Sequence, residues 1–103
     1  MFINYSEEEI FRVIHEMLRQ VLRVETGRIT PEARVIRDLG ADSLDVLDLH
    51  FRIEKTFGFS IADGEIMESL GTGLTQEEID SAFTVQRIVD FTARKLSTQS
   101  VPA

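Results

Sequence analysis

Three segments of this chain repeat their apolar residues with the 3.6-residue period of an α-helix, and this pattern constrains the fold most strongly. In the first segment, Ser6 and Glu9 have the spacing of a capping box, which predicts a helix from about Glu7 to Val24. No stretch alternates apolar and polar residues over a useful length, so we expect no strand. The apolar positions of the first helix are Ile10, Ile14, Met17, Leu18 and Val21.

The other two periodic segments predict a central and a final helix. The central helix begins at Asp42 or Ser43 and continues to about Phe57, where Gly58 ends it. Thr84 is suited to be the N-cap of the final helix, and we expect a flexible tail over residues 97–103. The inner stripe of the final helix comprises Val85, Ile88, Val89, Thr92 and Leu96.

Two irregular stretches separate these helices. Residues 26–42 have no clean period, and we expect an ordered loop that Ile29, Val35, Ile36 and Leu39 anchor on the core. Glycines interrupt residues 61–83, where we expect a short helical turn at 65–70. A second turn should start at Thr75, which forms a capping box with Glu78. The pattern predicts a single all-α domain over residues 1–103, with an ordered core at about 5–96.

Composition narrows the classes of partner. With 18 acidic and 11 basic residues among 103, the formal charge of −7 opposes binding to nucleic acid and favours basic protein partners. The absence of cysteine excludes disulfides, thiolate metal sites and a cysteine nucleophile. The sequence shows neither a signal-peptide pattern nor an apolar run of about 20 residues, so we expect a cytoplasmic monomer without stable membrane insertion.

The run Asp38-Leu39-Gly40-Ala41-Asp42-Ser43-Leu44-Asp45 precedes and opens the central helix. Gly40 allows a backbone turn that a side chain would hinder, and the turn brings Ser43 to the start of the helix with its hydroxyl toward solvent. A phosphodiester on Ser43 would lie beside unpaired N–H groups, at the positive end of the helix dipole. In isolation, Asp42 and Ser43 could equally be ordinary helix caps.

This eight-residue run resembles the phosphopantetheine attachment site of acyl carrier proteins. The helix before it, the long loop and Thr84-Val85-Gln86 also fit that family, and the likeness is weakest at 61–83. The resemblance implies a four-helix bundle with an extra short helix before the last one. It further implies a non-catalytic carrier whose Ser43 receives 4'-phosphopantetheine from coenzyme A through a phosphopantetheinyl transferase. Acyl groups would travel on it as thioesters, in fatty-acid, lipid or polyketide biosynthesis.

The central helix carries a second apolar stripe, which we interpret as a docking surface for basic patches on enzymes that make or transfer acyl chains. From Asp38 to Phe51 there are four acids and no lysine or arginine. The alternative is that the second stripe packs beneath loop 26–42. The expected docking residues are Asp42, Leu44, Asp45, Leu47, Asp48 and Phe51.

Two other functions stay open, namely an aminoacyl or peptidyl carrier and an unmodified interaction module with the carrier fold. Three bases, Arg37, Arg52 and Lys55, depart from the usual acidity of the family. The 41 positions from Ser43 to Thr84 exceed the usual spacing by about a dozen residues. These extra residues form either a pocket for an unusual acyl chain or a surface elaboration that thickens the core.

The remaining candidates have ordinary structural interpretations. A calcium loop at Asp38 is rejected, because Leu49 occupies the place of the bidentate glutamate, and we expect no metal site. His50 is expected to be partly buried with a hydrogen bond, with a contact to the prosthetic arm as the alternative. The residues expected as core aromatics are Phe11, Phe51, Phe57, Phe59, Phe83 and Phe91.

Overall fold

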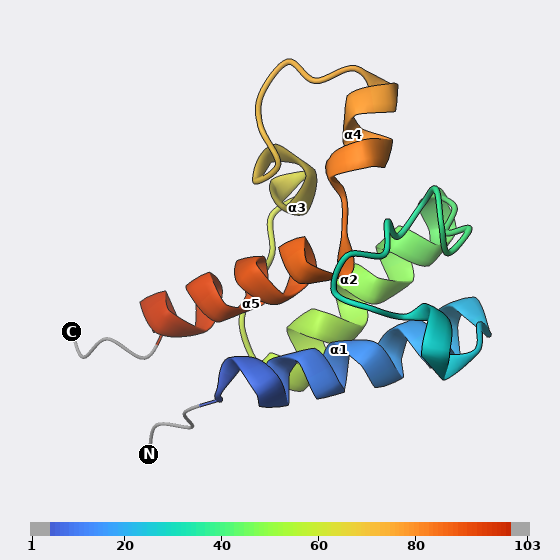
Figure 1. Ribbon diagram of the computed structural model, residues 1–103. Coiled ribbons are helices and arrows are strands. Elements are labelled where there is room, and N and C mark those ends of the chain that lie inside the picture. Colours follow the sequence, from blue (N-terminus) through green and yellow to red (C-terminus); the bar gives the residue numbers. More distant parts are fainter. Residues whose placement is uncertain (1–4, 100–103) are drawn as a thin grey trace.

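Helices make up the regular structure of residues 5–99, the part of the chain that this computed structural model describes (Figure 1). Within that part no strand occurs, and the only β-type pairing is an isolated antiparallel bridge between Arg34 and Thr84. The predicted all-α fold with an extra short helix is confirmed. The elements are α1 (Glu7–Leu22), a 3₁₀ turn (Thr26–Arg28), α2 (Ser43–Phe57), α3 (Glu65–Glu68), α4 (Gln76–Ala82) and α5 (Val85–Gln99).

The core lies where α1 packs against α2 and α5. In Figure 1, α1 runs along the bottom of the view beneath the other two helices. Each long helix contributes the apolar face that its period predicts, and burial of these side chains is the main stabilising contribution to the fold. Fully buried members of this core include Ile10, Ile14, Leu18, Leu49, Ile53, Ile88 and Val89.

Local capping explains where most helices begin and end. The predicted boxes at Ser6 and Thr75 are both present, and Gly58 ends α2 in the left-handed conformation. The predicted end of α1 at Val24 is wrong by two residues, because Arg23 adopts a left-handed backbone with φ 55° and caps the helix. At the other end of the chain, α5 continues to Gln99, and positions 100–103 of the expected tail lie outside the described residues.

The loop between α1 and α2 is anchored as predicted. Ile29, Val35 and Leu39 are buried, and Ile36 packs against the core. Backbone hydrogen bonds then join the loop to the start of α5: Val35 N donates to Phe83 O at 2.8 Å, and Val85 N donates to Ala33 O at 2.9 Å. These bonds satisfy polar groups that the loop would otherwise bury unpaired.

The segment between α2 and α5 rises above the three long helices in Figure 1, with α3 and α4 joined by a long connection. The short helical turn predicted for 65–70 is confirmed, with α3 ending at Glu68. Ile66 and Phe83 are buried, and Met67 and Leu70 pack against the core, so both ends of the segment are attached. None of the helices in residues 5–99 has the length and apolar character needed to cross a membrane.

Candidate functional site

Ser43 is the first residue of α2 and is exposed to solvent. Its hydroxyl has no hydrogen-bond partner within residues 5–99, and neither do the backbone N–H groups of Ser43 and Leu44. This is the normal condition of the first turn of a helix, whose leading N–H groups have no intrahelical acceptor. The hydroxyl and two free donors therefore face solvent together at the positive end of the helix.

The acids on either side of Ser43 cap the helix. Asp45 N donates to Asp42 Oδ1 at 2.8 Å, and Asp42 N donates to Asp45 Oδ2 at 3.0 Å, which completes a reciprocal capping box. Both side chains are consequently held at the helix start. The sequence predicts a cap at this position. Asp45 as its second member is a finding of the structure, although the three-residue spacing is visible in the sequence.

The loop that delivers Ser43 is held by Asp38. Arg34 donates to both carboxyl oxygens of Asp38 from its guanidinium, each at 3.0 Å, and its backbone N–H donates to Oδ2 at 2.8 Å. The Arg34 hydrogen bonds hold the pKa of Asp38 below its usual range. Arg28 adds a hydrogen bond to Asp38 O at 2.7 Å. Neither arginine is among the predicted site residues, although Arg34 and Asp38 have the i,i+4 spacing that is typical of helical ion pairs.

Gly40 completes this turn with φ +77°, a left-handed conformation that residues with a side chain rarely adopt. Its N–H donates to Ile36 O at 3.0 Å, and Ala41 N donates to Val35 O at 3.1 Å. Ala41 is buried, whereas Asp42 and Ser43 are exposed. The turn thus anchors the chain one residue before the cap and leaves the serine outside the core.

The second stripe of α2 is exposed. Leu44 retains 73%, Phe51 58% and Leu47 47% of their accessible surface, and these are the large apolar side chains that the described residues expose. The alternative in which they pack beneath loop 26–42 is therefore wrong, as is the placing of Phe51 among the core aromatics. The other five expected core aromatics are buried or pack partly buried against the core, namely Phe11, Phe57, Phe59, Phe83 and Phe91.

Beyond Leu47, an arginine compensates the negative charge on the outer face of α2. Arg52 Nε donates to Asp48 Oδ1 at 2.9 Å, and Arg52 Nη1 donates to Gln20 Oε1 of α1 at 3.2 Å. The pair is exposed, so it contributes little to stability. It does neutralise Asp48 locally. The strongest uncompensated negative charge beside the exposed stripe therefore lies at the Ser43 end.

Neither histidine is placed to activate Ser43. His50, with 13% of its side chain exposed, has Nε2 3.1 Å from Ile61 O and 3.6 Å from Glu54 Oε2. His15 Nε2 lies 3.2 Å from Thr26 O. Both rings therefore hold backbone segments, and the predicted structural role of His50 is confirmed.

The sequence of this chain matches a family model and several known proteins. A sequence model described as a phosphopantetheine attachment site matches residues 12–73. An acyl carrier protein of Thermotoga maritima is 41% identical over 61 residues, which are 59% of this chain and 75% of the relative. One of Helicobacter pylori strain G27 is 38% identical over 64 residues, 62% of this chain and 82% of the relative. One of Coprothermobacter proteolyticus is 32% identical over 94 residues, which are 91% of this chain and 99% of the relative.

The match to the phosphopantetheine attachment model covers more than half of this helical chain and defines a phosphopantetheine-dependent carrier. The chain belongs to the acyl carrier protein family. It is a non-catalytic carrier with a covalently attached 4'-phosphopantetheine group, whose thiol holds acyl groups as thioesters. As a family member it interacts with biosynthetic enzymes.

Proposed function

We propose that Ser43 is the residue that bears the phosphopantetheine group. The observation that carries this proposal is the exposed, unbonded hydroxyl at the first position of α2, in the middle of the motif that resembles the family's attachment site. Free N–H groups of Ser43 and Leu44 would receive phosphate oxygens, and the helix dipole favours the negative charge there. The residues present therefore suit a phosphodiester.

A separate phosphopantetheinyl transferase would attach the group. The Ser43 oxygen forms a bond to the phosphorus that carries pantetheine, the pyrophosphate bond of coenzyme A breaks, and adenosine 3',5'-bisphosphate leaves. The hydroxyl proton must go to a base of the transferase, because both histidines of this chain are engaged with backbone carbonyls. The carrier itself supplies position and exposure.

Intact mass after incubation with coenzyme A and a transferase tests the assignment. We expect the mass to rise by one phosphopantetheine group in the native chain and to stay unchanged in Ser43→Ala. Ser60→Ala is the matched control, because Ser60 is also exposed but lies in the α2–α3 connection. A native chain that gains no mass would support the alternative of an unmodified interaction module, and retention of the gain in Ser43→Ala would refute the site.

We further propose that the exposed stripe of α2 docks the transferase and the acyl-processing enzymes through their basic patches. Leu44, Leu47 and Phe51 supply apolar contact area, and the uncompensated acids Asp42 and Asp45 lie where they steer a basic patch to Ser43. Supporting this role, these apolar side chains have no cover in residues 5–99. Asp48 contributes less than expected, since Arg52 already pairs with it.

Amide substitutions test the docking role without breaking the caps. Charge reversal of Asp45 would destroy the capping box, whereas Asp45→Asn keeps an acceptor for Asp42 N and removes only the charge. We expect the double variant Asp45→Asn/Asp48→Asn to be modified severalfold more slowly at low salt, with a flatter salt dependence. Glu25→Gln, an exposed acid outside α2, is the charge control. Unchanged rates at every salt concentration would contradict docking through these acids.

The proposal also includes the extent of the domain and the pathway that the carrier serves. One carrier domain spanning residues 1–103 is supported by the single core cluster, to which all three long helices and both connections contribute. The pathway is fatty-acid, lipid or polyketide biosynthesis, and all relatives named above are acyl carriers rather than aminoacyl or peptidyl carriers. Monomeric state and cytoplasmic localisation stay predictions from the sequence.

A further inference from the structure

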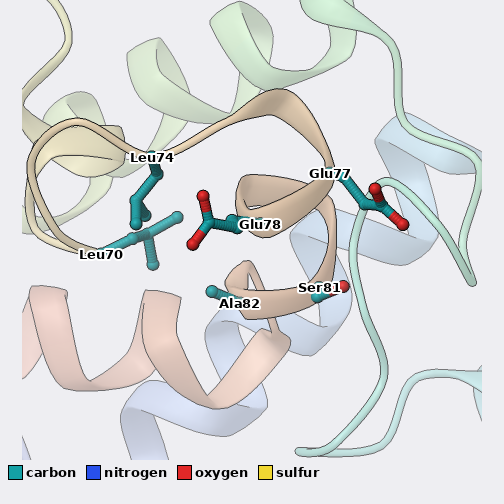
Figure 2. Close-up of a pocket in the computed structure, with 6 residues that line it drawn as sticks. All are labelled: Leu70, Leu74, Glu77, Glu78, Ser81 and Ala82. Atoms are coloured by element: carbon teal, nitrogen blue, oxygen red, sulfur yellow. The ribbon is translucent and has the colours of Figure 1, made fainter.

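A groove of about 440 Å³, open to solvent, lies where α1 and α2 pack together. Met17 is the buried member of its lining, and the other side chains are polar or charged. The groove beside α4, whose lining Figure 2 shows, has the same volume but contains carboxylates and no base. Bases therefore distinguish the α1–α2 groove. Its lining comprises Met17, Gln20, Asp48, Arg52, Lys55 and Thr56.

The α1–α2 groove carries excess positive charge on a chain whose formal charge is −7. Arg52 Nε donates to Asp48 Oδ1 at 2.9 Å, and Arg52 Nη1 donates to Gln20 Oε1 at 3.2 Å. Arg52 Nη2 makes no hydrogen bond within residues 5–99. Asp48 is the one acid of the lining and balances one of its two bases. The charge of the second base is left over.

This second base is Lys55, whose exposed side chain forms neither an ion pair nor a hydrogen bond in the part of the chain that the structure describes. Lys55 lies in the last turn of α2, where a positive charge suits the helix dipole. A base on any side of that turn would serve the dipole equally, but Lys55 lies on the side that lines the groove. Its ammonium is available to an acceptor on another molecule.

The groove is continuous with the exposed apolar stripe of α2. Phe51 follows Asp48 by three residues and precedes Lys55 by four, and residues with these spacings are neighbours on the surface of a helix. Phe51 itself retains 58% of its accessible surface. A partner that covers Phe51 therefore also reaches the groove.

The charges along this surface of α2 change sign from one end to the other. Asp42 and Asp45 lie at its start, and Arg52 and Lys55 lie near its end. With a rise of about 1.5 Å per residue, Asp45 and Lys55 are roughly 15 Å apart along the helix axis. A wholly basic patch that covered both ends would place like charges together at Lys55, which costs binding free energy. An acid at that end of the patch would instead form an opposite-charge pair.

A single carboxylate on a partner protein suits the groove best. A phosphate dianion would approach Asp48 as closely as it approaches the bases, and in this open groove it would stay hydrated. A hydrocarbon chain would cover the ammonium of Lys55 without giving it a partner. One aspartate or glutamate matches the one excess charge, and the apolar contact at the neighbouring stripe supplies the affinity that one exposed ion pair lacks.

We propose that the α1–α2 groove receives an aspartate or glutamate side chain of the enzymes that act on this carrier, so that these enzymes present an acid together with their basic patch. The proposal rests on the docking role of α2 proposed above. An acid opposite Lys55 and a base opposite Asp45 fix the direction in which a partner lies along α2. An enzyme with bases at both ends is disfavoured, so the groove determines specificity.

A helical peptide with opposite charges at its two ends tests the groove on the phosphopantetheine-loaded chain. The glutamate probe is acetyl-Glu-Glu-Ala-Leu-Ala-Gln-Leu-Leu-Ala-Gln-Leu-Lys-Lys-amide, whose charged ends are about 15 Å apart when it is helical. The glutamine probe has glutamine in place of both glutamates. Binding is followed by backbone amide NMR shifts at about 0.15 M salt, which screens long-range attraction. We expect the glutamate probe to give saturable shifts at Gln20, Arg52 and Lys55 as well as at residues 44–51.

Lys55→Gln is the decisive variant, because no contact of the Lys55 side chain within residues 5–99 is lost with it. We expect it to weaken binding of the glutamate probe by about two- to threefold, the effect of one exposed ion pair, and to leave the glutamine probe unchanged. Arg87→Gln, which removes an exposed base of α5, is the matched control and should affect neither probe. Asp45→Asn should weaken both probes, since both carry the lysine end.

Two results would overturn the proposal. These are an equal effect of Lys55→Gln on both probes and shifts of the glutamate probe that are confined to residues 44–51. A dependence on Lys55 without any effect of Asp45→Asn would support the groove and contradict the steering role proposed for the acids. The absence of saturable shifts anywhere on α2 would refute docking on this helix and the groove with it. Loading is read first by intact mass, so a failure of the carrier function is seen separately.

Discussion

The loop at 26–42 and the segment at 58–84 both join long helices, but they are held in different ways. The loop before Ser43 has buried anchors along its whole length, and backbone hydrogen bonds connect it to α5. The later segment is attached by buried residues on both sides of its middle, namely Phe59, Ile61, Ile66 and Phe83. The connection from Gly71 to Thr75 between them has only the partly buried Leu74 to hold it. Irregular backbone is fixed where side chains and distant carbonyls replace the missing helical hydrogen bonds.

This difference fits the role proposed for Ser43. A serine that must meet one modifying enzyme in one geometry gains from a rigid approach, which Asp38 and the capping box provide. The junction between the two regions is Phe83, whose carbonyl accepts from Val35 N and whose side chain is buried.

The largest effect is expected from Phe83→Ala. The side chain is 1% exposed, and its removal leaves a cavity at the junction, so the free energy of unfolding should fall by about 3–5 kcal/mol. Leu74→Ala, in the loosely held connection, should cost only about 1 kcal/mol. Urea unfolding followed by circular dichroism measures both. Equal losses would show that the connection is as firmly packed as the junction.

The next largest loss of stability is expected from Gly40→Ala. A methyl group at Gly40 meets no atom within 4 Å, so its cost arises from the left-handed φ of +77° alone and should be about 1–2 kcal/mol. Gly73 has φ +70° and equally open surroundings. If the later segment is the looser one, Gly73→Ala should cost less, because the backbone there can relax. The same unfolding measurement compares them, and a larger loss at Gly73 would reverse the comparison.

The sequence predicted the parts of the fold whose signals are local. The capping pairs at Ser6 and Thr75 fixed two helix starts, and Gly58 marked the end of α2, because each acts through neighbours within four residues. Arg23 gave no such signal, since a non-glycine residue rarely takes the left-handed conformation that ends α1. The bonds from Val35 to Phe83 were also hidden, because they join residues far apart in the sequence.

The predictions for the functional site also succeeded where the signal was local. The position of Ser43 at a helix start followed from its motif, whereas the exposure of Phe51 did not, because an aromatic residue type favours burial in general. The period of α2 placed Phe51 on the outer stripe, and that geometric signal proved better than residue type. Whether the extra residues before α5 form a pocket for an acyl chain or a surface elaboration stays open, since apolar residues alone do not show whether they close on each other.

Asp42→Ala and Thr75→Ala remove the equivalent cap from the two regions. Losing an N-cap costs about 1 kcal/mol. At Asp42 the loss should appear in global unfolding, because α2 contributes Leu49 and Ile53 to the core. At Thr75 it should appear mainly as faster hydrogen exchange of the α4 amides, with a smaller change in the urea midpoint. Asp42→Asn and Thr75→Ser, which keep a capping oxygen, should stay near the native values. A global loss at Thr75 as large as at Asp42 would contradict the difference in attachment.

The smallest expected effect is the change in stability at acid pH that Asp38 causes. Since hydrogen bonds from Arg34 depress the pKa of Asp38 in the folded state, the unfolded chain binds more protons near that range, and stability rises with pH. This contribution is fully present above the unfolded pKa of about 4 and is lost as pH falls through the lower folded value. The side chain is 38% exposed, so solvent screening keeps it small. The stability difference between the native chain and Asp38→Asn should therefore shrink from pH 6 to pH 3 in urea titrations. A difference that stays constant would show that the Asp38 carboxylate holds the loop through its shape and not through its charge.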